Sequence, residues 1–132
     1  MTSSQANTLS KNERLKSKKI SDELFASKKS INLFPFKVVY CLVPSLPAEG
    51  VAQVMFVSPK RNLKKAHERN RIKRLMRESY RRHKHSLLLF LEKENKKLAL
   101  AFIYLGNTET LTLNESDNKI IKLLEQVILK CS

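Results

Sequence analysis

The cationic side chains of residues 60–84 are the groups whose type and spacing most clearly suit a chemical task. This stretch holds twelve Lys or Arg and two Glu, a local net charge of +10 in a chain whose formal net charge is +14. Between residues 69 and 82, arginine outnumbers lysine by six to one. A guanidinium forks onto phosphate and stacks on bases, which an ammonium cannot do. The composition therefore predicts a binding surface for a polyanion with fixed phosphates and base edges, such as a folded RNA.

The same stretch has the periodicity of an amphipathic helix. No Gly or Pro interrupts it after Pro59, and one helical stripe gathers Ile72, Leu75, Met76, Ser79 and Tyr80. The opposite face gathers Lys73, Arg74, Arg77, Arg81 and Lys84. Like charges one turn apart repel, so a merely solvated face usually mixes signs. We therefore favour a nucleic-acid face over a solvated one, and we expect Glu78 to hold Arg74.

Groups able to hydrolyse a phosphodiester are missing from the pattern. No HExxH, P-loop or GxSxG string occurs, and the twelve acidic residues are scattered, whereas a two-metal nuclease needs clustered carboxylates. His83 and His85 face different ways on a helix, so we expect no shared metal. The sequence predicts no catalytic residue, no metal site and no cofactor bound by the protein alone.

The whole chain has the size of one small domain. Its 132 residues suffice for a single core, and no apolar run approaches the roughly 18 residues of a membrane span. Met1–Ser10 is polar and lacks the apolar centre of a signal peptide, while Cys41 and Cys131 have no metal or redox spacing. We expect a disordered tail over residues 1–10, one domain over 11–132, no membrane contact and a cytoplasmic location.

Periodicity and turn residues predict the order α-β-β-α-β-α. We expect helices over 11–29, the basic stretch and 115–130, and strands over 36–43, 51–57 and 98–105. Pro44, Pro47 and Gly50 punctuate the link between the first two strands. The fold class is thus an α/β sandwich, in which a small sheet carries packed helices and includes a strand-helix-strand crossover.

The string Arg69-Asn70-Arg71-x-Lys73-Arg74-x-x-Arg77-Glu78 resembles the signature of the protein component of bacterial ribonuclease P. The flanks resemble the same family, in its order and at its length. They comprise a first helix within residues 14–25, a strand beginning at residues 36–40, a strand end at 57–60, a strand at 98–105 and a closing helix at 115–130. The resemblance covers residues 12–130.

This resemblance implies a subunit that binds two partners, the catalytic RNA and the 5′ leader of precursor tRNA. The RNA would hold Mg²⁺ and cleave the leader to give the mature tRNA 5′ end, and the crossover would be left-handed where the general rule expects a right-handed one. The implied RNA-binding residues are the motif and its neighbouring cations: Lys60, Arg61, Lys64, Lys65, Arg69, Asn70, Arg71, Lys73, Arg74, Arg77 and Arg81. The implied leader cleft comprises Phe25, Phe36, Tyr40 and Lys60.

Several alternatives remain open at this point. Phe36, Val38, Tyr40 and Leu42 share one face of their strand, which is equally consistent with a core face. The glycine-free link 61–68 departs from the short, Gly-containing link of the family, so its path is not predicted. Two other functions also remain, namely a small basic ribosomal or RNA-chaperone protein, and a metal-dependent nuclease that acts without RNA.

Overall fold

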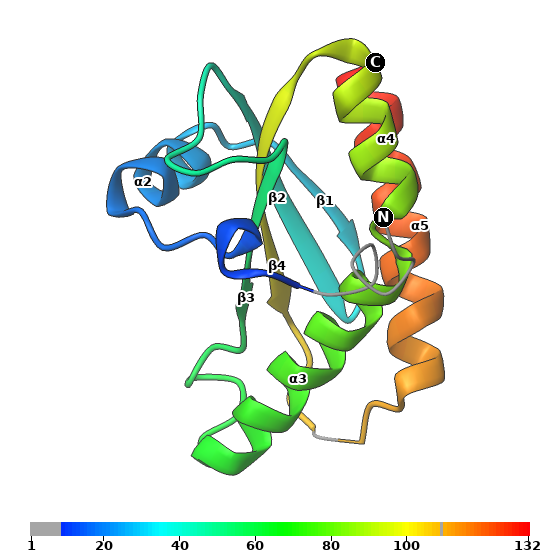
Figure 1. Cartoon of the computed structure of the whole chain (residues 1–132). Helices are drawn as coiled ribbons and strands as arrows, with labels where there is room; N and C mark the ends of the chain where they lie inside the picture. Colours follow the sequence, from blue (N-terminus) through cyan, green and yellow to red (C-terminus); the bar gives the residue numbers. More distant parts are fainter. Residues whose placement is uncertain (1–8, 109) are drawn as a thin grey trace.

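The structure, a computed structural model, describes residues 9–108 and 110–132 as one sheet with helices on both faces (Figure 1). The elements in chain order are the 3-10 helix η1 (Lys11–Glu13), α2 (Lys18–Ala26), β1 (Ser30–Leu33), β2 (Phe36–Val43), β3 (Ala52–Val57), α3 (Ala66–His83), α4 (His85–Glu94), β4 (Lys97–Tyr104) and α5 (Leu113–Cys131). The predicted α/β class is confirmed. None of the described helices is long and apolar enough to cross a membrane.

The sheet has the strand order β1-β2-β4-β3, so the last strand in the chain is inserted between β2 and β3. β1 and β2 form an antiparallel hairpin, and β2 pairs antiparallel with β4, with Val39 opposite Ala101. β3 pairs parallel with β4, with Val54 opposite Leu100. The connection between these parallel strands runs through α3 and α4. Viewed from the helices with both strands pointing up, β4 lies to the left of β3, so the crossover is left-handed, as the resemblance implied.

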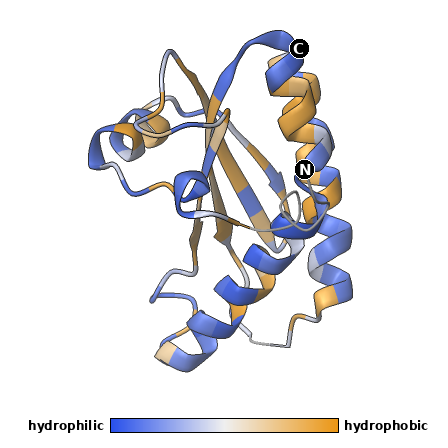
Figure 2. Ribbon diagram, viewed as in Figure 1, coloured by the Kyte–Doolittle hydropathy of each residue, from blue (hydrophilic) through white to orange (hydrophobic). Residues whose placement is uncertain are grey.

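Alternation along the strands divides the apolar residues between two cores. The larger core lies between the sheet and helices α3, α4 and α5, and it contains Val38, Leu100 and Phe102, all with no exposed surface. The smaller core lies under α2, where Ile20 and Leu24 pack on the opposite face of β2 and β4. Side chains of β2 and β4 therefore point alternately into the two cores. Figure 2 shows the central strands largely in hydrophobic colours, as expected of strands that are covered on both faces.

The structure differs from the predicted elements in three places. The strand β1 was not predicted, because it is only four residues long and follows Lys28, whose backbone is left-handed at φ 59°. Within the basic stretch 60–84, only Ala66–His83 is helical, and the helix α4, which was not predicted, follows from His85. The predicted tail over 1–10 falls outside the described residues up to residue 8, but Leu9 packs against the larger core and Ser10 caps η1.

Candidate nucleic-acid interface

Helix α3 is anchored by its predicted apolar stripe. Ile72 and Met76 have no exposed surface and Tyr80 is 1 % exposed, because the stripe faces the sheet and α5. Ser79 donates its hydroxyl to that of Ser116 on α5 over 2.8 Å, which pairs two buried polar groups. The opposite side of the helix leaves Asn70, Arg74 and Arg77 exposed, as the sequence pattern predicted for these three residues.

Two arginines of the motif bind backbone of this same chain. Arg69 donates to the carbonyl oxygens of Leu63 and Lys64 over 2.9 and 2.7 Å. Arg71 donates to the carbonyl oxygen of Leu111 over 2.9 Å. Arg69 thus holds the link before α3 and Arg71 the loop before α5. The motif combines scaffold contacts with exposed cations, which sequence spacing alone does not separate.

The path of the glycine-free link is now defined. It turns at Pro59, whose carbonyl oxygen accepts from the amides of Asn62 and Leu63. Leu63 is 4 % exposed, and the side-chain amide of Asn62 donates to the carbonyl oxygen of Tyr104 over 3.2 Å. The predicted RNA-binding cations of this segment lie on its outer side and are all exposed: Lys60, Arg61, Lys64 and Lys65.

The prediction that Glu78 holds Arg74 is wrong. Glu78 forms its ion pair with Arg81 rather than with Arg74, and the hydrogen bond from Arg81 holds the pKa of the Glu78 carboxyl below its usual value. Arg82 pairs with Asp117 of α5 over 2.8 Å. The cations at the C-terminal end of α3 are thus partly neutralised, while Arg74 and Arg77 stay available to a ligand.

The helical wheel also misplaces Lys84. This residue was expected on the cationic face, but its side chain is 2 % exposed and its ammonium lies 2.6 Å from a carboxylate oxygen of Glu13. The register of the wheel changes because α3 ends at His83 and α4 starts at His85. Lys84 is therefore turned inward at the junction, toward the N-terminal segment.

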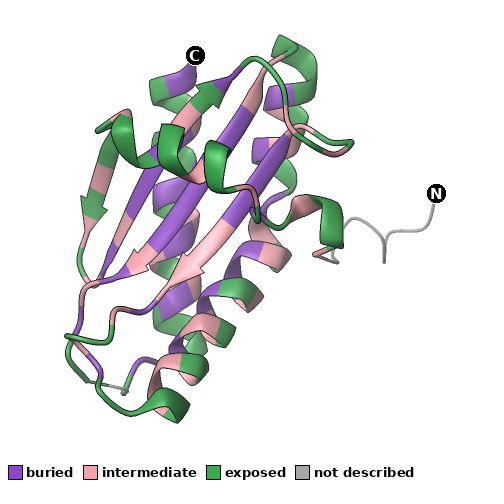
Figure 3. Cartoon of the chain, turned by 90° about the vertical axis from the view of Figure 1, so that its left-hand side faces the viewer, coloured by how far each residue is buried: buried purple, intermediate pink, exposed green. Residues whose placement is uncertain are grey.

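The face of the sheet that carries α2 is only partly covered. Figure 3 shows α2 crossing one end of this face, while the other end of the strands remains half-exposed. Lys37, Met55, Val57 and Ile103 are the half-buried residues of that open end. A groove of about 250 Å³ runs between α2 and the sheet, lined by Phe25, Lys28, Ser30, Lys37, Val39 and Ile103. Phe25 is 43 % exposed at its rim.

A second groove of about 270 Å³ lies at the β3 edge, between the N-terminal segment and α3. We call it the edge groove. Met55 and Phe56 supply apolar surface, and the cations come from both walls, Arg14 and Lys16 on one side and Lys73 and Arg77 on the other. Apolar and aromatic surface between opposed cations suits a strand of nucleic acid, since phosphates meet the charges while bases contact the floor.

The expectation for two of the three cleft aromatics is corrected. Phe36 has no exposed surface and Tyr40 is 9 % exposed, because both belong to the larger core under α5. Burial raises the pKa of the Tyr40 hydroxyl. Successive residues of a strand point to opposite faces, so the side chains that reach the open face are Lys37 and Val39. Of the predicted aromatics, only Phe25 is placed to meet a ligand.

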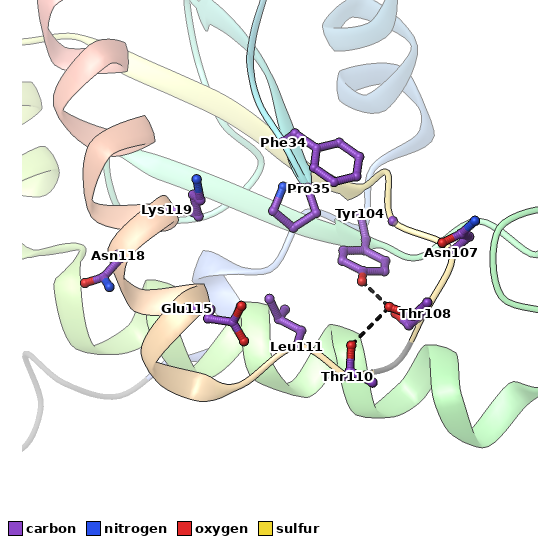
Figure 4. A pocket seen from close by; sticks show the side chains of 11 residues that line it. Phe34, Pro35, Tyr104, Asn107, Thr108, Thr110, Leu111, Glu115, Asn118 and Lys119 are labelled. Atoms are coloured by element: carbon purple, nitrogen blue, oxygen red, sulfur yellow. Dashed lines mark hydrogen bonds between the residues drawn. The ribbon is translucent and has the colours of Figure 1, made fainter.

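A third hollow lies around the start of α5 (Figure 4). It measures about 390 Å³, and Phe34, Pro35 and Tyr104 form its apolar side. The Tyr104 hydroxyl donates to the carbonyl oxygen of Thr108 over 2.6 Å. Lys119 and Glu115 are the charged residues of this lining, so it lacks the cationic character of the two grooves. Across the described ranges, no group of three or more His, Cys, Asp or Glu is arranged to hold a metal ion.

Comparison with known proteins decides the family. The family model described as "Ribonuclease P" matches residues 9–128. The chain belongs to the ribonuclease P protein family. It is 35 % identical over 107 residues to the ribonuclease P protein component of Porphyromonas gingivalis, covering 81 % of this chain and 77 % of that protein. It is 32 % identical over 120 residues to the component of Chlorobium phaeobacteroides, covering 83 % and 80 %.

A solved structure of the Staphylococcus aureus RNase P protein has the same fold. It aligns with a TM-score of 0.66 at 18 % identity, covering 89 % of this chain and 96 % of that one. The resemblance drawn from the arginine motif is therefore confirmed as to the ribonuclease P family. Membership implies a part in the processing of tRNA 5′ ends.

Four cationic residues that line the edge groove or the groove beside α2 were not predicted from the sequence. They are Arg14, Lys16, Lys28 and Lys37. Arg14 and Lys16 precede α2 in a segment whose attachment to β3 no local pattern indicates. Lys37 was available from alternation, since it is the polar residue between Phe36 and Val38 on β2. Assigning the face of β2 from that lysine would have identified the open side of the sheet.

Proposed function

We propose that this chain is the protein subunit of a ribonucleoprotein that matures tRNA 5′ ends in the cytoplasm, and that it acts by binding RNA. The exposed side of α3 and the link before it would contact the catalytic RNA. The open face of the sheet would hold the single-stranded 5′ leader of precursor tRNA. The observation that carries the proposal is that Arg74 and Arg77 are exposed on α3, the helix that forms one wall of the edge groove beside the sheet.

The groups at each surface suit these two tasks differently. Guanidinium groups on a rigid helix match the fixed phosphates of a folded RNA, and the anchored stripe of α3 keeps them in place. The groove beside α2 offers Phe25 as a stacking surface, with Lys28 and Lys37 for the phosphates of a single strand. The protein's contribution would be to neutralise charge and to position the leader.

Cleavage itself is assigned to the catalytic RNA with its bound Mg²⁺, which would activate the attacking water. The scattered acidic residues of the sequence support this division of labour. In reconstitution, we expect the protein with its ribonuclease P RNA in Mg²⁺ to process precursor tRNA faster than the RNA alone. Protein freed of RNA and of contaminating nucleases should leave the precursor intact.

A matched variant makes the test specific. The double variant Arg74→Ala/Arg77→Ala should fold normally and lose most of the acceleration, because both side chains are exposed on the side opposite the anchor. Precursor cleavage by the RNA-free protein would instead support a metal-dependent nuclease. Copurification with ribosomal RNA, in place of one abundant structured RNA, would support a ribosomal or chaperone role.

A further inference from the structure

The N-terminal segment, residues 9–17, forms one wall of the edge groove, and it is attached to the sheet from outside. Arg14 makes an isolated parallel bridge with Val54, in which the Leu15 amide donates to the Val54 carbonyl oxygen over 2.9 Å. The side-chain amide of Gln53 donates to the carbonyl oxygen of Asn12 over 3.0 Å. This segment therefore covers the edge of β3 with few backbone hydrogen bonds.

A buried ion pair supplies the long-range attachment. Glu13 of η1 and Lys84 of the α3–α4 junction are 71 residues apart, and their charged atoms lie 2.6 Å apart. The Lys84 side chain is 2 % exposed and that of Glu13 is 19 % exposed, so the contact is largely withdrawn from water. The other oxygen of Glu13 accepts from the amide and the hydroxyl of Ser10. One carboxylate thus joins the helix junction to the first turn of the segment.

The position of the pair relates it to the edge groove. Arg14 directly follows Glu13, and Arg14 and Lys16 face Lys73 and Arg77 across this groove. The Tyr80 hydroxyl is also near: burial, with a smaller contribution from the Glu13 carboxylate, raises its pKa. Glu13 thus contacts the body of the protein, while its chain neighbour Arg14 lines the groove.

We propose that Glu13 is a positioning residue for RNA, which acts through its ion pair with Lys84 to hold Arg14 and Lys16 opposite Lys73 and Arg77. The inference rests on the proposed RNA-binding function. An acidic residue in a protein of net charge +14 would thereby strengthen the binding of a polyanion. The negative charge of Glu13 by itself would weaken the binding of RNA, so the proposed effect on RNA affinity has the opposite sign.

The sign difference provides the test. Glu13→Gln keeps the acceptor for Ser10 but removes the charge, and the full-length variant is titrated with ribonuclease P RNA transcribed from the same genome. We expect the affinity of Glu13→Gln for this RNA to be about tenfold lower than that of the wild type. The slope of log affinity against log salt concentration should be smaller in magnitude by about one to two, because the phosphate contacts of Arg14 and Lys16 are loosened. Glu125→Gln, the same change at an exposed site on α5, should bind as tightly as the wild type or slightly tighter.

A second variant separates positioning from stability. Glu13→Gln/Lys84→Met removes both charges, so the ammonium that Glu13→Gln leaves buried without its carboxylate is removed as well. We expect its melting temperature to recover while RNA affinity stays low and the Leu15 amide exchanges faster than in the wild type. Affinity that recovers together with melting temperature would overturn the proposal, as would Glu13→Gln that binds as the wild type does.

The two proposals fail in different ways. A wild-type protein that does not bind ribonuclease P RNA would overturn the proposed function, and with it the role of Glu13 toward RNA. A wild type that binds, with the same affinity and salt dependence in Glu13→Gln, would overturn only the positioning role. Exchange of the Leu15 amide reports on the attachment without any RNA.

Discussion

The guanidinium of Arg71 donates a hydrogen bond of 2.9 Å to the carbonyl oxygen of Leu111, 40 residues further along the chain. The bond joins the motif helix to the loop that leads into α5, where Leu111 is 6 % exposed in the larger core. One arginine of the arginine motif thus supports the packing of the helix that carries the motif. Substitutions within the motif should separate into those that affect folding and those that affect RNA.

Arg71→Ala tests the first class. A hydrogen bond from a charged donor contributes about 1.5–3 kcal/mol, so we expect a comparable loss in the free energy of unfolding, measured with urea. Arg71→Lys should lose most of this stability too, because the lysine side chain is shorter and its ammonium does not reproduce the planar donor geometry of the guanidinium. Wild-type unfolding of Arg71→Ala with impaired RNA binding would show instead that Arg71 acts mainly on RNA.

Arg74→Ala and Arg77→Ala test the second class. Each should weaken binding of ribonuclease P RNA by about 1–3 kcal/mol if it makes a charge-assisted contact to phosphate. Both residues are exposed, so melting temperatures should stay near that of the wild type. Lys122→Ala, which removes an exposed cation from α5, serves as the matched control. Unchanged affinity in both arginine variants would reduce this surface to an ordinary solvated helix face.

Phe25→Ala and Phe36→Ala make the same chemical change in opposite environments. Phe36→Ala should lower the free energy of unfolding by about 3–5 kcal/mol, since the ring is fully buried beside Tyr104 with ring centroids 5.9 Å apart. Phe25→Ala should leave stability nearly unchanged. It should weaken binding of precursor tRNA by about 1–3 kcal/mol relative to mature tRNA, if a leader base stacks on the ring.

Thermal melts and parallel titrations with the two tRNAs decide this pair of variants. Equal weakening toward both tRNAs in Phe25→Ala would remove the aromatic from the leader site. A stable Phe36→Ala with a selective loss on precursor tRNA would show that the ring leaves the core when the leader binds.

Acid should weaken the start of α5. The Glu115 carboxylate accepts from the Thr112 amide over 3.0 Å and from its hydroxyl over 2.9 Å, and these bonds, the backbone one first, lower the pKa of Glu115. A carboxyl with a lowered folded-state pKa stabilises the fold above its unfolded pKa, and this stabilisation is lost as pH falls through the folded value. Glu115→Gln should flatten that part of the pH dependence of melting, and NMR titration should give a lower pKa for Glu115 in the folded protein than in the unfolded chain.

The sequence predicted elements correctly where a single hydrophobic pattern, that of a helix or of a strand, was clear. The stripe of Ile72, Met76 and Tyr80 correctly places the buried side of α3, and the run at residues 36–43 matches β2. It failed where tertiary contacts decide between equivalent options. Alternation on β2 defines two faces, but the packing of α5 determines that the face of Phe36 is the core. Likewise, no local signal indicates that Lys84 is turned toward Glu13.

The arginine motif shows the same limit within the site. Its spacing identifies the family, yet it does not separate Arg69 and Arg71, which bind carbonyl groups of the chain, from Arg74 and Arg77, which are exposed. That separation depends on the path of the link over residues 58–65 and of the loop before α5. Both segments are irregular, so neither has a periodicity from which their contacts are predicted.

The insertion of β4 between β2 and β3 determines when this protein can fold during translation. β2 and β3 each pair with β4 and not with each other. The sheet therefore cannot be completed until β4, which ends at residue 104, has left the ribosome, and α5 emerges after that. The arginine-rich helix is therefore synthesised before the scaffold that orients it. For that interval the nascent chain presents a concentrated positive charge beside ribosomal RNA, without the geometry that would confine it to one partner.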